Sequence, residues 1–380
     1  MLDSTEHTQG GRMYWLASWV TPLMALLAYL LFWPIPVEPQ AWSVPKAQGY
    51  TGAHLRNERL AGLQQWPLGK GQEGPEFIAH HQGVLYTGLA NGDVLSMGLD
   101  GQHQSLVANT GGRPLGLAVA ADGSLLVADA MRGLLRITGR GAQARMDTLL
   151  TEVNHPVPHD PVRYADAVEL SPDGRIWVTD ASRRFGAKAT GSTFEASVLD
   201  ILEHSCTGRV LALDAQAAHP QVVLAGLCFP NGMAFTADGR TMFLSETGTF
   251  RILKVDLDKL AKVRAADPAG VPRVQEAMSQ GAVSVLLDNL PGYPDNLTRG
   301  EQGRIWVGLT KPRSPILDFS AGHPTVRALT LRLPRAWWPV PKAYGHILAF
   351  NEAGQVVADL QDPSGAYPET TSATEVGGKL

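Results

Sequence analysis

A recurring glycine turn is the feature that most constrains how this chain can fold. In six places a polar turn closes on a glycine and an alternating run of β-forming residues follows. The fragments are HHQGVLYTG, AADGSLLVAD, SPDGRIWVTD, TADGRTMFLSE, GEQGRIWVGL and EVGGKL, with glycines at Gly83, Gly123, Gly174, Gly239, Gly303 and Gly378. Six hairpin turns at spacings of tens of residues indicate a repeated blade.

Each repeat has room for four strands. The turn joins a preceding strand to a following one, and two further strands fit before the next turn. GRVLALD and QVVLAGL are such a second pair, and so are GHILAFN and QVVADLQ. Because a four-stranded sheet cannot cover its own apolar faces, stacking such sheets around an axis buries them. We therefore predict an all-β fold, a six-bladed β-propeller, over residues 71–380.

The composition agrees with a large, turn-rich domain and argues against one class of partner. The 380 residues include 40 Gly and 26 Pro, which favour many turns over long helices. The net charge is −4, only 18% of residues are charged, and no block of Lys and Arg stands out. Since phosphate backbones are recognised by such basic blocks, we expect no binding to nucleic acid.

The N-terminal region differs from the repeats. After a short tail at 1–13, residues 14–33 (YWLASWVTPLMALLAYLLFW) carry no charge and are long enough to cross a hydrocarbon layer. We predict a transmembrane anchor, with a cleaved signal peptide as the alternative. Arg12 precedes the segment and the first following lysine is Lys46, which favours a single-pass membrane protein with its N-terminus in the cytoplasm and an extracytoplasmic propeller.

Two features near the ends of the propeller lead to further expectations. Residues 34–70 are interpreted as a stalk, within which 55–68 are a possible latch strand for the last blade. The sixth repeat stops at Leu380, when its second strand has barely begun. We therefore predict a truncated sixth blade and a gap between blades five and one.

Polar side chains recur just before the first strand of the blades. In a propeller these positions face one mouth of the central channel. The equivalent positions hold Glu76, Leu115, Asp166, Asn231 and Asp295, the last followed by Asn296. Converging carboxylate and amide oxygens are the donors that Ca²⁺ takes, so a shared calcium site is predicted. The alternative is that these residues are ordinary turn formers.

The repeats resemble a known family. GPEFIAHHQGVLYTGLANGDVL, GGRPLGLAVAADGSLLVADAMRGLLRI, FPNGMAFTADGRTMFLSETGTFRILK and LPGYPDNLTRGEQGRIWVGL are similar to the strictosidine synthase-like propellers, in the membrane-anchored branch typified by adipocyte plasma membrane-associated protein. The wider group includes paraoxonases, gluconolactonases and diisopropylfluorophosphatase-type enzymes. The resemblance implies a channel calcium ion held by Glu76, Asp166, Asn231 and Asp295, with Asp166 replacing a more usual asparagine.

Departures from that group narrow the expected chemistry. Leu115 stands where paraoxonases have a catalytic histidine, and Thr371 aligns with the catalytic glutamate of the plant synthases, so neither reaction carries over. Metal-assisted hydrolysis remains, with Asp295 at the position of the nucleophile in the phosphotriesterase relatives. We expect a membrane-anchored, Ca²⁺-dependent ester or lactone hydrolase. The alternative is a non-catalytic propeller that binds a protein or lipid at the membrane, with structural calcium.

Residues around the mouth are candidates for substrate contact. Besides Leu115 and Asn296, these are Asp180 and Glu246, which like Asp129 end the second strand of a blade; a turn or cap role is their alternative. Insertions at 183–207 and 312–343 follow second strands and should overhang the mouth as lids over a small apolar ester- or lactone-like substrate. Contact with the membrane or with a partner is the alternative.

The two cysteines form a separate prediction. GRVLALD and QVVLAGL pair in an antiparallel register that brings Cys206 close to Cys228 across the hairpin. We expect the two within range of a disulfide, the alternative being two small buried residues that meet by chance.

Overall fold

The computed structural model describes residues 7–267 and 269–380, with side chains from Val20 onward. Five four-stranded antiparallel sheets form the body of the described chain, each with its strands in sequence order. They are β1 (Ile78–His81), β2 (Val84–Gly88), β3 (Asp93–Gly98), β4 (Ser105–Asn109); β5 (Pro114–Val119), β6 (Leu125–Asp129), β7 (Gly133–Thr138), β8 (Arg145–Leu150); β11 (Ala165–Leu170), β12 (Ile176–Asp180), β13 (Gly208–Leu213), β14 (Gln221–Leu227); β15 (Pro230–Phe235), β16 (Thr241–Glu246), β17 (Arg251–Asp256), β18 (Val283–Leu287); and β19 (Gly292–Arg299), β20 (Ile305–Pro312), β21 (Gly345–Phe350), β22 (Val356–Asp362). A two-stranded ribbon, β9 (Glu152–Val153) with β10 (Asp160–Pro161), lies between the second and third sheets in sequence.

The sheets follow one another around an axis. Their first strands are neighbours in the order β1, β5, β11, β15 and β19, as in the blades of a propeller. The all-β prediction is therefore confirmed, and so are the strand pairs expected at 208–227 and 345–362.

The repeated glycines occupy the hairpins between the first and second strands. Gly83, Gly123, Gly174, Gly239 and Gly303 have φ values of 79°, 80°, 83°, 68° and 76°. Residues with a Cβ rarely adopt this left-handed conformation, so glycine is the residue that lets each turn close at low cost.

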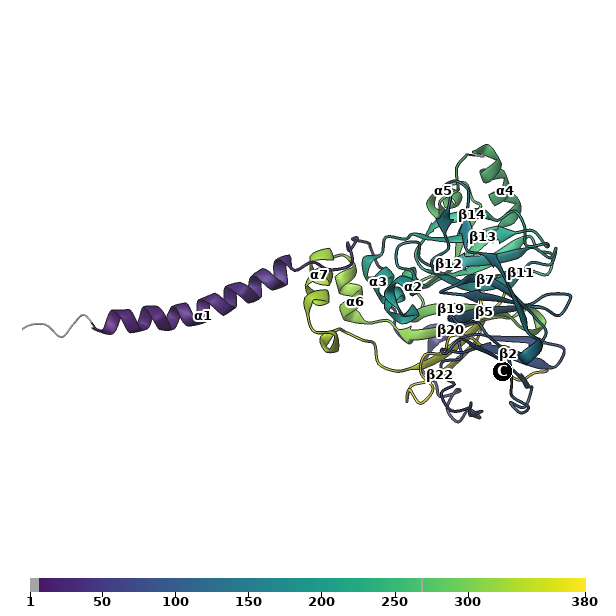
Figure 1. Ribbon diagram of the computed structural model, residues 1–380, viewed down its shortest axis with the longest axis horizontal. Helices are drawn as coiled ribbons and strands as arrows, with labels where there is room; N and C mark the ends of the chain where they lie inside the picture. The colour runs from purple at the N-terminus through teal and green to yellow at the C-terminus, as the bar shows by residue number, and fades with distance from the viewer. Residues whose placement is uncertain (1–6, 268) are drawn as a thin grey trace, which may run out of the picture.

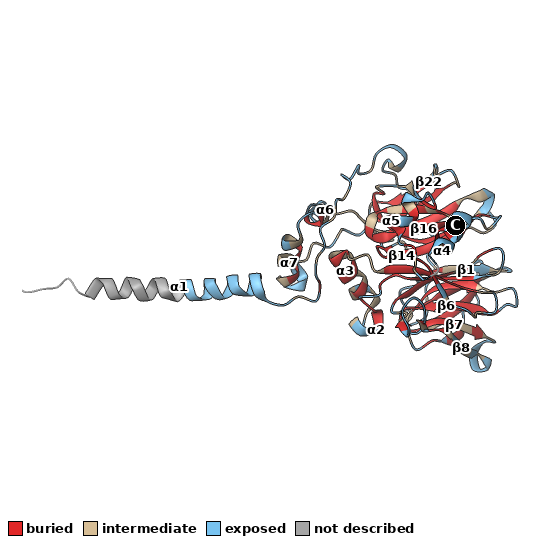
Figure 2. Ribbon diagram, turned by 90° about the horizontal axis from the view of Figure 1, so that it is seen from above, coloured by how far each residue is buried: buried red, intermediate tan, exposed pale blue. Residues whose placement is uncertain are grey.

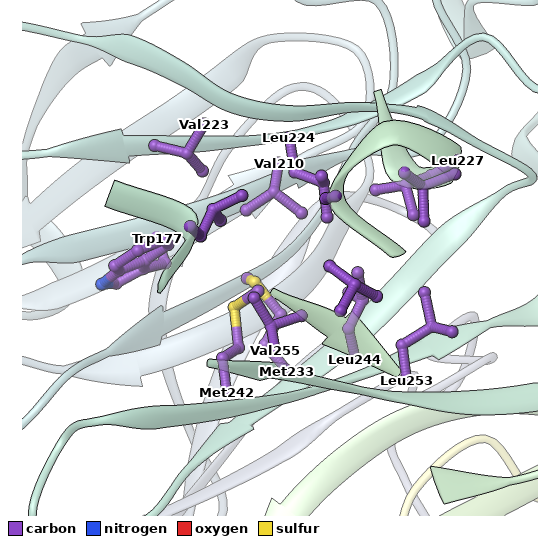
Figure 3. Close-up of a cluster of buried hydrophobic side chains, with 14 of the residues drawn as sticks. Trp177, Val210, Val223, Leu224, Leu227, Met233, Met242, Leu244, Leu253 and Val255 are labelled. Atoms are coloured by element: carbon purple, nitrogen blue, oxygen red, sulfur yellow. The ribbon is translucent and has the colours of Figure 1, made fainter. Parts of the chain in front are cut away.

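The hydrophobic core lies between adjacent sheets. In the largest cluster, Trp177, Val210 and Leu224 of the third sheet pack against Met233 and Leu244 of the fourth (Figure 3). Leu224 is fully buried, and its truncation to alanine should cost about 2–5 kcal/mol through lost burial and the cavity left behind. Apolar residues on the strands thus join neighbouring blades, and the inner strands are buried whereas outer strands such as β8 are largely exposed (Figure 2).

Helices interrupt three of the sheets. α2 (Ala187–Thr190) and α3 (Thr193–Glu203) join β12 to β13, α4 (Leu257–Ala266) and α5 (Val274–Ser279) join β17 to β18, and α6 (Pro315–Ala321) and α7 (Pro324–Arg332) join β20 to β21. The short 3₁₀ turns are η1 (Gly52–His54), η2 (Gly141–Gln143), η3 (Thr247–Thr249), η4 (Glu301–Gly303) and η5 (Arg335–Trp337). α3, α6 and α7 gather on the side of the body from which the N-terminal helix projects (Figure 1).

The N-terminal helix α1 (His7–Phe32) begins before the predicted start of the anchor. Residues 1–6 of the predicted tail lie outside the described residues. No helix in the described part of the chain combines the length and the hydropathy needed to cross a membrane.

The chain after α1 packs against the insertion helices. Val37 is buried beside Phe185 and Leu331, and the Gln40 amide donates to the Glu203 carbonyl at the end of α3 (2.7 Å). Trp42 stacks on His204 with ring centroids 4.1 Å apart. The first part of the expected stalk is therefore held against the body.

Residues 55–68 do not form the expected latch strand. The Leu60 amide donates to the Gln361 carbonyl of β22 (3.0 Å), but the Ala61 amide turns back to Glu58, so no ladder develops. Leu60 nevertheless packs against the flank of the fifth sheet with 2% exposure. Further on, the Pro67 carbonyl accepts a hydrogen bond from Gln104 of the first sheet's outer loop. The segment crosses between the fifth and first sheets without forming a strand.

The last residues close the ring on its inner side. The Thr371 hydroxyl donates to the Glu76 carbonyl (2.5 Å), and the Asn296 amide donates to the Thr371 carbonyl (3.1 Å). Gly378 lies in a turn closed by Val376 and Lys379. As expected, the described residues 369–380 join no four-stranded sheet.

The cysteine prediction is confirmed. Cys206 and Cys228 form a disulfide with their Cα atoms 3.9 Å apart. Cys206 precedes β13 and Cys228 follows β14, the two strands whose register suggested the pairing.

Candidate metal centre

β-Bulges in the inner strands position the predicted site residues. The ladder between the first and second strands shifts register between Ala165 and Val168, and equivalent shifts occur around Leu115, Asn231 and the pair Asp295–Asn296. A bulge takes a residue out of the regular alternation and re-aims its side chain. Each of these four inner strands therefore presents its site residue from an irregular backbone rather than from the pleated sheet.

Two of these bulges leave backbone groups without a ladder partner, and hydroxyl side chains on the second strands of blades bond to them. Thr179 Oγ1 accepts a hydrogen bond from the Ala167 amide (2.9 Å), next to Asp166. Ser245 Oγ donates to the Asp295 carbonyl (2.5 Å). The irregular backbone that carries two of the carboxylates is thus held by a hydroxyl of the adjacent strand at Asp166 and by a hydroxyl of the preceding blade at Asp295, as buried amide and carbonyl groups require.

Glycines beside the bulges let the inner strands approach one another. A Cβ added to Gly232 would lie 2.0 Å from the Leu297 nitrogen, and one added to Gly116 would lie 2.7 Å from the Ala167 Cα. Any side chain there would force adjacent blades apart. The glycine that follows Asn231 in sequence is therefore required by the close contact with the strand that carries Asp295.

The predicted oxygen donors line one cavity of about 340 Å³. Glu76, Asp166, Asn231 and Asp295 all contribute to its wall, with Leu115 beside them. Both insertions contribute apolar residues to the lining: Phe194, Val198, Ile201 and Leu202 of α3, Leu317 of α6, and Trp338 and Val340 after α7. The structure thus brings the candidate ligands together beneath the two segments predicted to overhang them.

The three carboxyl groups perturb one another. Burial, opposed by Arg113 and aided by Glu369, raises the pKa of Glu76 to about 7. Burial and then the charge of Glu76 raise the pKa of Asp166 well above its usual range. Burial, Glu76 and Asp166 likewise raise the pKa of Asp295. Three neighbouring carboxyls, of which Asp166 and Asp295 are buried and Glu76 is partly exposed, cannot all ionise at low cost without added positive charge.

The donor chemistry of this centre fits a calcium ion. Asn231 Oδ1 and Asp295 Oδ1 are buried and have no hydrogen-bond partner among the described residues. Asn296 Oδ1 and Nδ2 are also buried and have no hydrogen-bond partner among the described residues, although Asn296 does not line the cavity. Unpaired buried oxygens beside repelling carboxylates are suited to a hard cation with oxygen ligands. Asn296, expected to contact substrate, is better interpreted as a further candidate ligand.

Asp180 and Glu246 have a different role from the substrate contact proposed for them. Asp180 Oδ1 accepts hydrogen bonds from the Arg163 and Tyr164 amides (3.1 and 2.9 Å), which lie three and two residues before Asp166. Glu246 Oε1 accepts from the Cys228 amide (2.9 Å), shortly before Asn231. Both are fully buried and neither lines the cavity. The alternative, a structural cap, is what the structure supports.

Asp129 has the same structural role in the second blade, binding backbone amides near the site position. Its Oδ1 accepts from the amides of Arg113, Met131 and Arg132 at 2.9–3.1 Å. The repeated acidic residue at the end of the second strand therefore holds the chain that leads into the site position.

Comparison with known proteins decides the family. Residues 72–328 match the profile described as the SMP-30/Gluconolactonase/LRE-like region. The chain belongs to this SMP-30/gluconolactonase-like family. Adipocyte plasma membrane-associated protein from Danio rerio is 26% identical over 94% of this chain and 84% of that protein. Strictosidine synthase-like protein 7 from Arabidopsis thaliana is 31% identical over 77% of this chain and 70% of that protein. Both matches confirm the resemblance deduced from the repeats.

Solved structures from the SMP-30/gluconolactonase-like group are more distant. The calcium-binding protein regucalcin from Agrobacterium tumefaciens has 16% sequence identity and a TM-score of 0.49, with 81% of this chain and 78% of that chain aligned.

Among the cavity residues that the sequence did not single out are three charged ones, Arg113, Lys311 and Glu369. Arg113 Nη2 lies 3.3 Å from Glu76 Oε2 and is the cation nearest to that carboxylate. Lys311 and Glu369 form an ion pair (2.5 Å) at the same cavity. Their partners lie in other blades, so no local pattern marks them.

Proposed function

We propose that this protein is a calcium-dependent hydrolase of small apolar esters or lactones. The observation that carries the proposal is the meeting of Glu76, Asp166, Asn231 and Asp295 in one cavity whose other walls are mainly apolar. A mainly apolar pocket with a few convergent polar groups is typical of sites that orient a small substrate.

The residues of this centre would have separate roles in the reaction. Glu76, Asp166, Asn231 and Asp295 would hold the ion, with Asn296 as a fifth donor. Bound there, Ca²⁺ would polarise the substrate carbonyl and stabilise the negative charge that develops on its oxygen. Asp295 is our candidate for the attacking group, either as nucleophile or as the base that takes a proton from water. The apolar residues of α3 and of the loop after α7 would bind the acyl part and exclude bulk water.

Membrane attachment through α1 is part of the proposal. The described part of this helix exposes Leu23, Met24, Leu26 and Leu31, and the matched relatives include proteins named as plasma membrane-associated. The Tyr29 hydroxyl donates to the Arg332 carbonyl (2.8 Å), so the end of the helix lies against α7. We infer that α1 anchors the propeller with its cavity side towards the membrane and its disulfide in an extracytoplasmic, oxidising compartment.

Hydrolysis of a substrate panel tests the catalytic proposal. Aryl esters, lactones and a phosphotriester are assayed with the purified full chain while free Ca²⁺ is titrated. We expect turnover that requires Ca²⁺ and falls roughly 100-fold or more in Asp295→Asn. Asp214→Asn is the matched control, because Asp214 is an outer-loop carboxylate paired with His219, and it should retain full activity.

Two results would overturn the proposal. Bound Ca²⁺ without turnover on any substrate would identify a non-catalytic propeller with structural calcium. Equal turnover by Asp295→Asn and by the wild type would remove Asp295 from the reaction. A separate experiment tests the anchor. The full chain should stay in the membrane fraction after alkaline extraction, and deletion of residues 1–33 should release it. Membrane retention by the deleted form would exclude α1 as the anchor.

A further inference from the structure

A second cluster of metal-binding side chains lies outside the cavity, on the fifth sheet. His54 Nδ1 and His346 Nε2 lie 2.8 and 2.9 Å from the same oxygen, Asp359 Oδ2. The three potential ligand atoms are all within 4.8 Å of one another. His346 is on β21, Asp359 is on β22, and His54 ends η1 in the segment that precedes the propeller. None of the three lines the cavity described above.

The carboxylate at the centre of the cluster is held in place by its neighbours. Asp359 Oδ1 accepts hydrogen bonds from Gln361 Nε2 (2.5 Å) and from Asn57 Nδ2 (3.4 Å). The imidazole of His346 is almost fully buried, while 20% of the His54 side chain is exposed. An oriented carboxylate with a second shell of amide donors and one ligand open to solvent is the arrangement that a bound metal needs.

We propose that His54, His346 and Asp359 bind one Zn²⁺ ion. Two imidazoles and one carboxylate are a zinc donor set, and a water would complete a tetrahedral site. Bonds of about 2.0–2.2 Å at tetrahedral angles place ligand atoms roughly 3.3 Å apart. The observed separations from the carboxylate oxygen therefore need to open by only a few tenths of an ångström. Each neutral imidazole would carry its proton on the ring nitrogen away from the metal.

The ion would clamp the N-terminal segment to the propeller. His54 and Asn57 belong to the segment that crosses between the fifth and first sheets, where Leu60 covers the flank of the fifth. In that segment η1, Asn57 and Leu60 are joined to β22 by hydrogen bonds. A zinc ion would add bonds between His54 and two strands that lie about 300 residues further along the chain. Zinc would thus stabilise closure of the ring, separately from the oxygen-only calcium centre.

Zinc binding to the full chain tests this inference. The purified protein is treated with a chelator selective for zinc over calcium and kept in millimolar Ca²⁺. Isothermal titration with Zn²⁺ should then show one high-affinity site per chain, and saturation should raise the thermal unfolding midpoint. Co²⁺ in place of Zn²⁺ should give the visible absorption of a tetrahedral site.

Three variants make the test specific. His54→Ala and Asp359→Asn should weaken zinc binding by more than about 100-fold, since even second-shell changes cost 10- to 100-fold. His159→Ala is the matched control, because His159 is an exposed histidine paired with Glu152, and it should bind zinc normally. Calcium binding, measured in parallel, reports that the His54→Ala protein is folded. The inference is overturned if the wild type binds no zinc, or if His54→Ala binds zinc as tightly as the wild type.

Discussion

At the scale of single residues, neighbouring positions in the repeat perform different tasks. Asp166 and Asn231 present oxygens to the centre, whereas Asp180 and Glu246, at the end of the adjacent strand, bind the backbone just before them. The hydroxyl one residue earlier, on Thr179 or Ser245, bonds the backbone of the residue that follows the site residue, Ala167 or Gly232. A site position is therefore maintained by two side chains that never reach the cavity.

Replacing Asp166 by Asn should weaken calcium binding. The amide keeps an oxygen donor but removes one of three negative charges, and ligand charge is a main determinant of Ca²⁺ affinity. We expect affinity to fall roughly 10- to 100-fold at neutral pH, measured by calorimetric titration of the wild type and Asp166→Asn. An unchanged affinity would show that Asp166 is not a ligand.

Replacing Arg209 by Met should strongly destabilise the fold. Arg209 is 2% exposed and bonds both Asp180 (2.9 Å) and Asp160 (2.6 Å). Its loss leaves the fully buried Asp180 without its cation and leaves Asp160 with Arg183 alone. We expect the free energy of unfolding to fall by about 3–5 kcal/mol. Lys259→Met, which breaks an exposed pair with Asp256, should cost less than about 1 kcal/mol in the same denaturant titration. Similar losses in both variants would contradict the assigned role.

At the scale of elements, the two insertions convert a polar channel mouth into an apolar cavity. α3 begins at the cap Ser192, whose hydroxyl accepts from the Glu195 amide, and turns Phe194, Val198 and Ile201 to the cavity. Arg327 of α7 is buried and donates to the carbonyls of Leu202, Gln40 and Ala321. The second insertion is thereby joined to α3 and to the segment after α1.

Truncation of Trp338 tests whether the insertions select the substrate. Trp338 lines the cavity and carries the Arg335 guanidinium 4.0 Å from its ring centroid. In Trp338→Ala, kcat/KM for a long-chain ester should fall roughly tenfold or more relative to an acetyl ester, because apolar contact with the acyl chain is lost. A proportional fall for both esters would indicate a general disturbance rather than recognition of the chain.

At the scale of the whole molecule, the ring encloses a concentration of negative charge at its axis. Glu76, Asp166 and Asp295 come from three different blades, and folding brings them together at the cost of raised pKa values. A bound divalent cation would offset this cost, so metal binding and folding are linked.

The stability of the calcium-free protein should therefore fall as pH rises. Burial raises the pKa of Glu76 to about 7 in the fold from its ordinary value of 4.5. The folded state therefore binds more protons than the unfolded state between these values, and stability falls as these protons are lost. We expect a loss on the order of 3 kcal/mol between pH 5 and pH 8. Denaturant titrations at both pH values, with and without Ca²⁺, measure this. A slope that is unaffected by saturating Ca²⁺ would contradict the linkage.

The sequence by itself determined the repeat, most of its strands and the main site positions. Hairpins pair residues that are close in the chain, so alternating runs around Gly123 or Gly239 predict the ladders directly. The disulfide between Cys206 and Cys228 followed from the same local register. Asp166, Asn231 and Asp295 could be recognised because each occupies the same place in its own blade.

Only the tertiary structure decided features whose partners are distant in sequence. The bulge at Asp295 depends on Ser245 of the preceding blade, and residues 55–68 form no strand because their contacts divide between the fifth and first sheets. Asp180 binds Arg209 and the Tyr164 amide, and its place in the repeat predicted neither contact. His54 meets His346 and Asp359 about 300 residues away, and no periodicity encodes a contact that exists only when the ring closes.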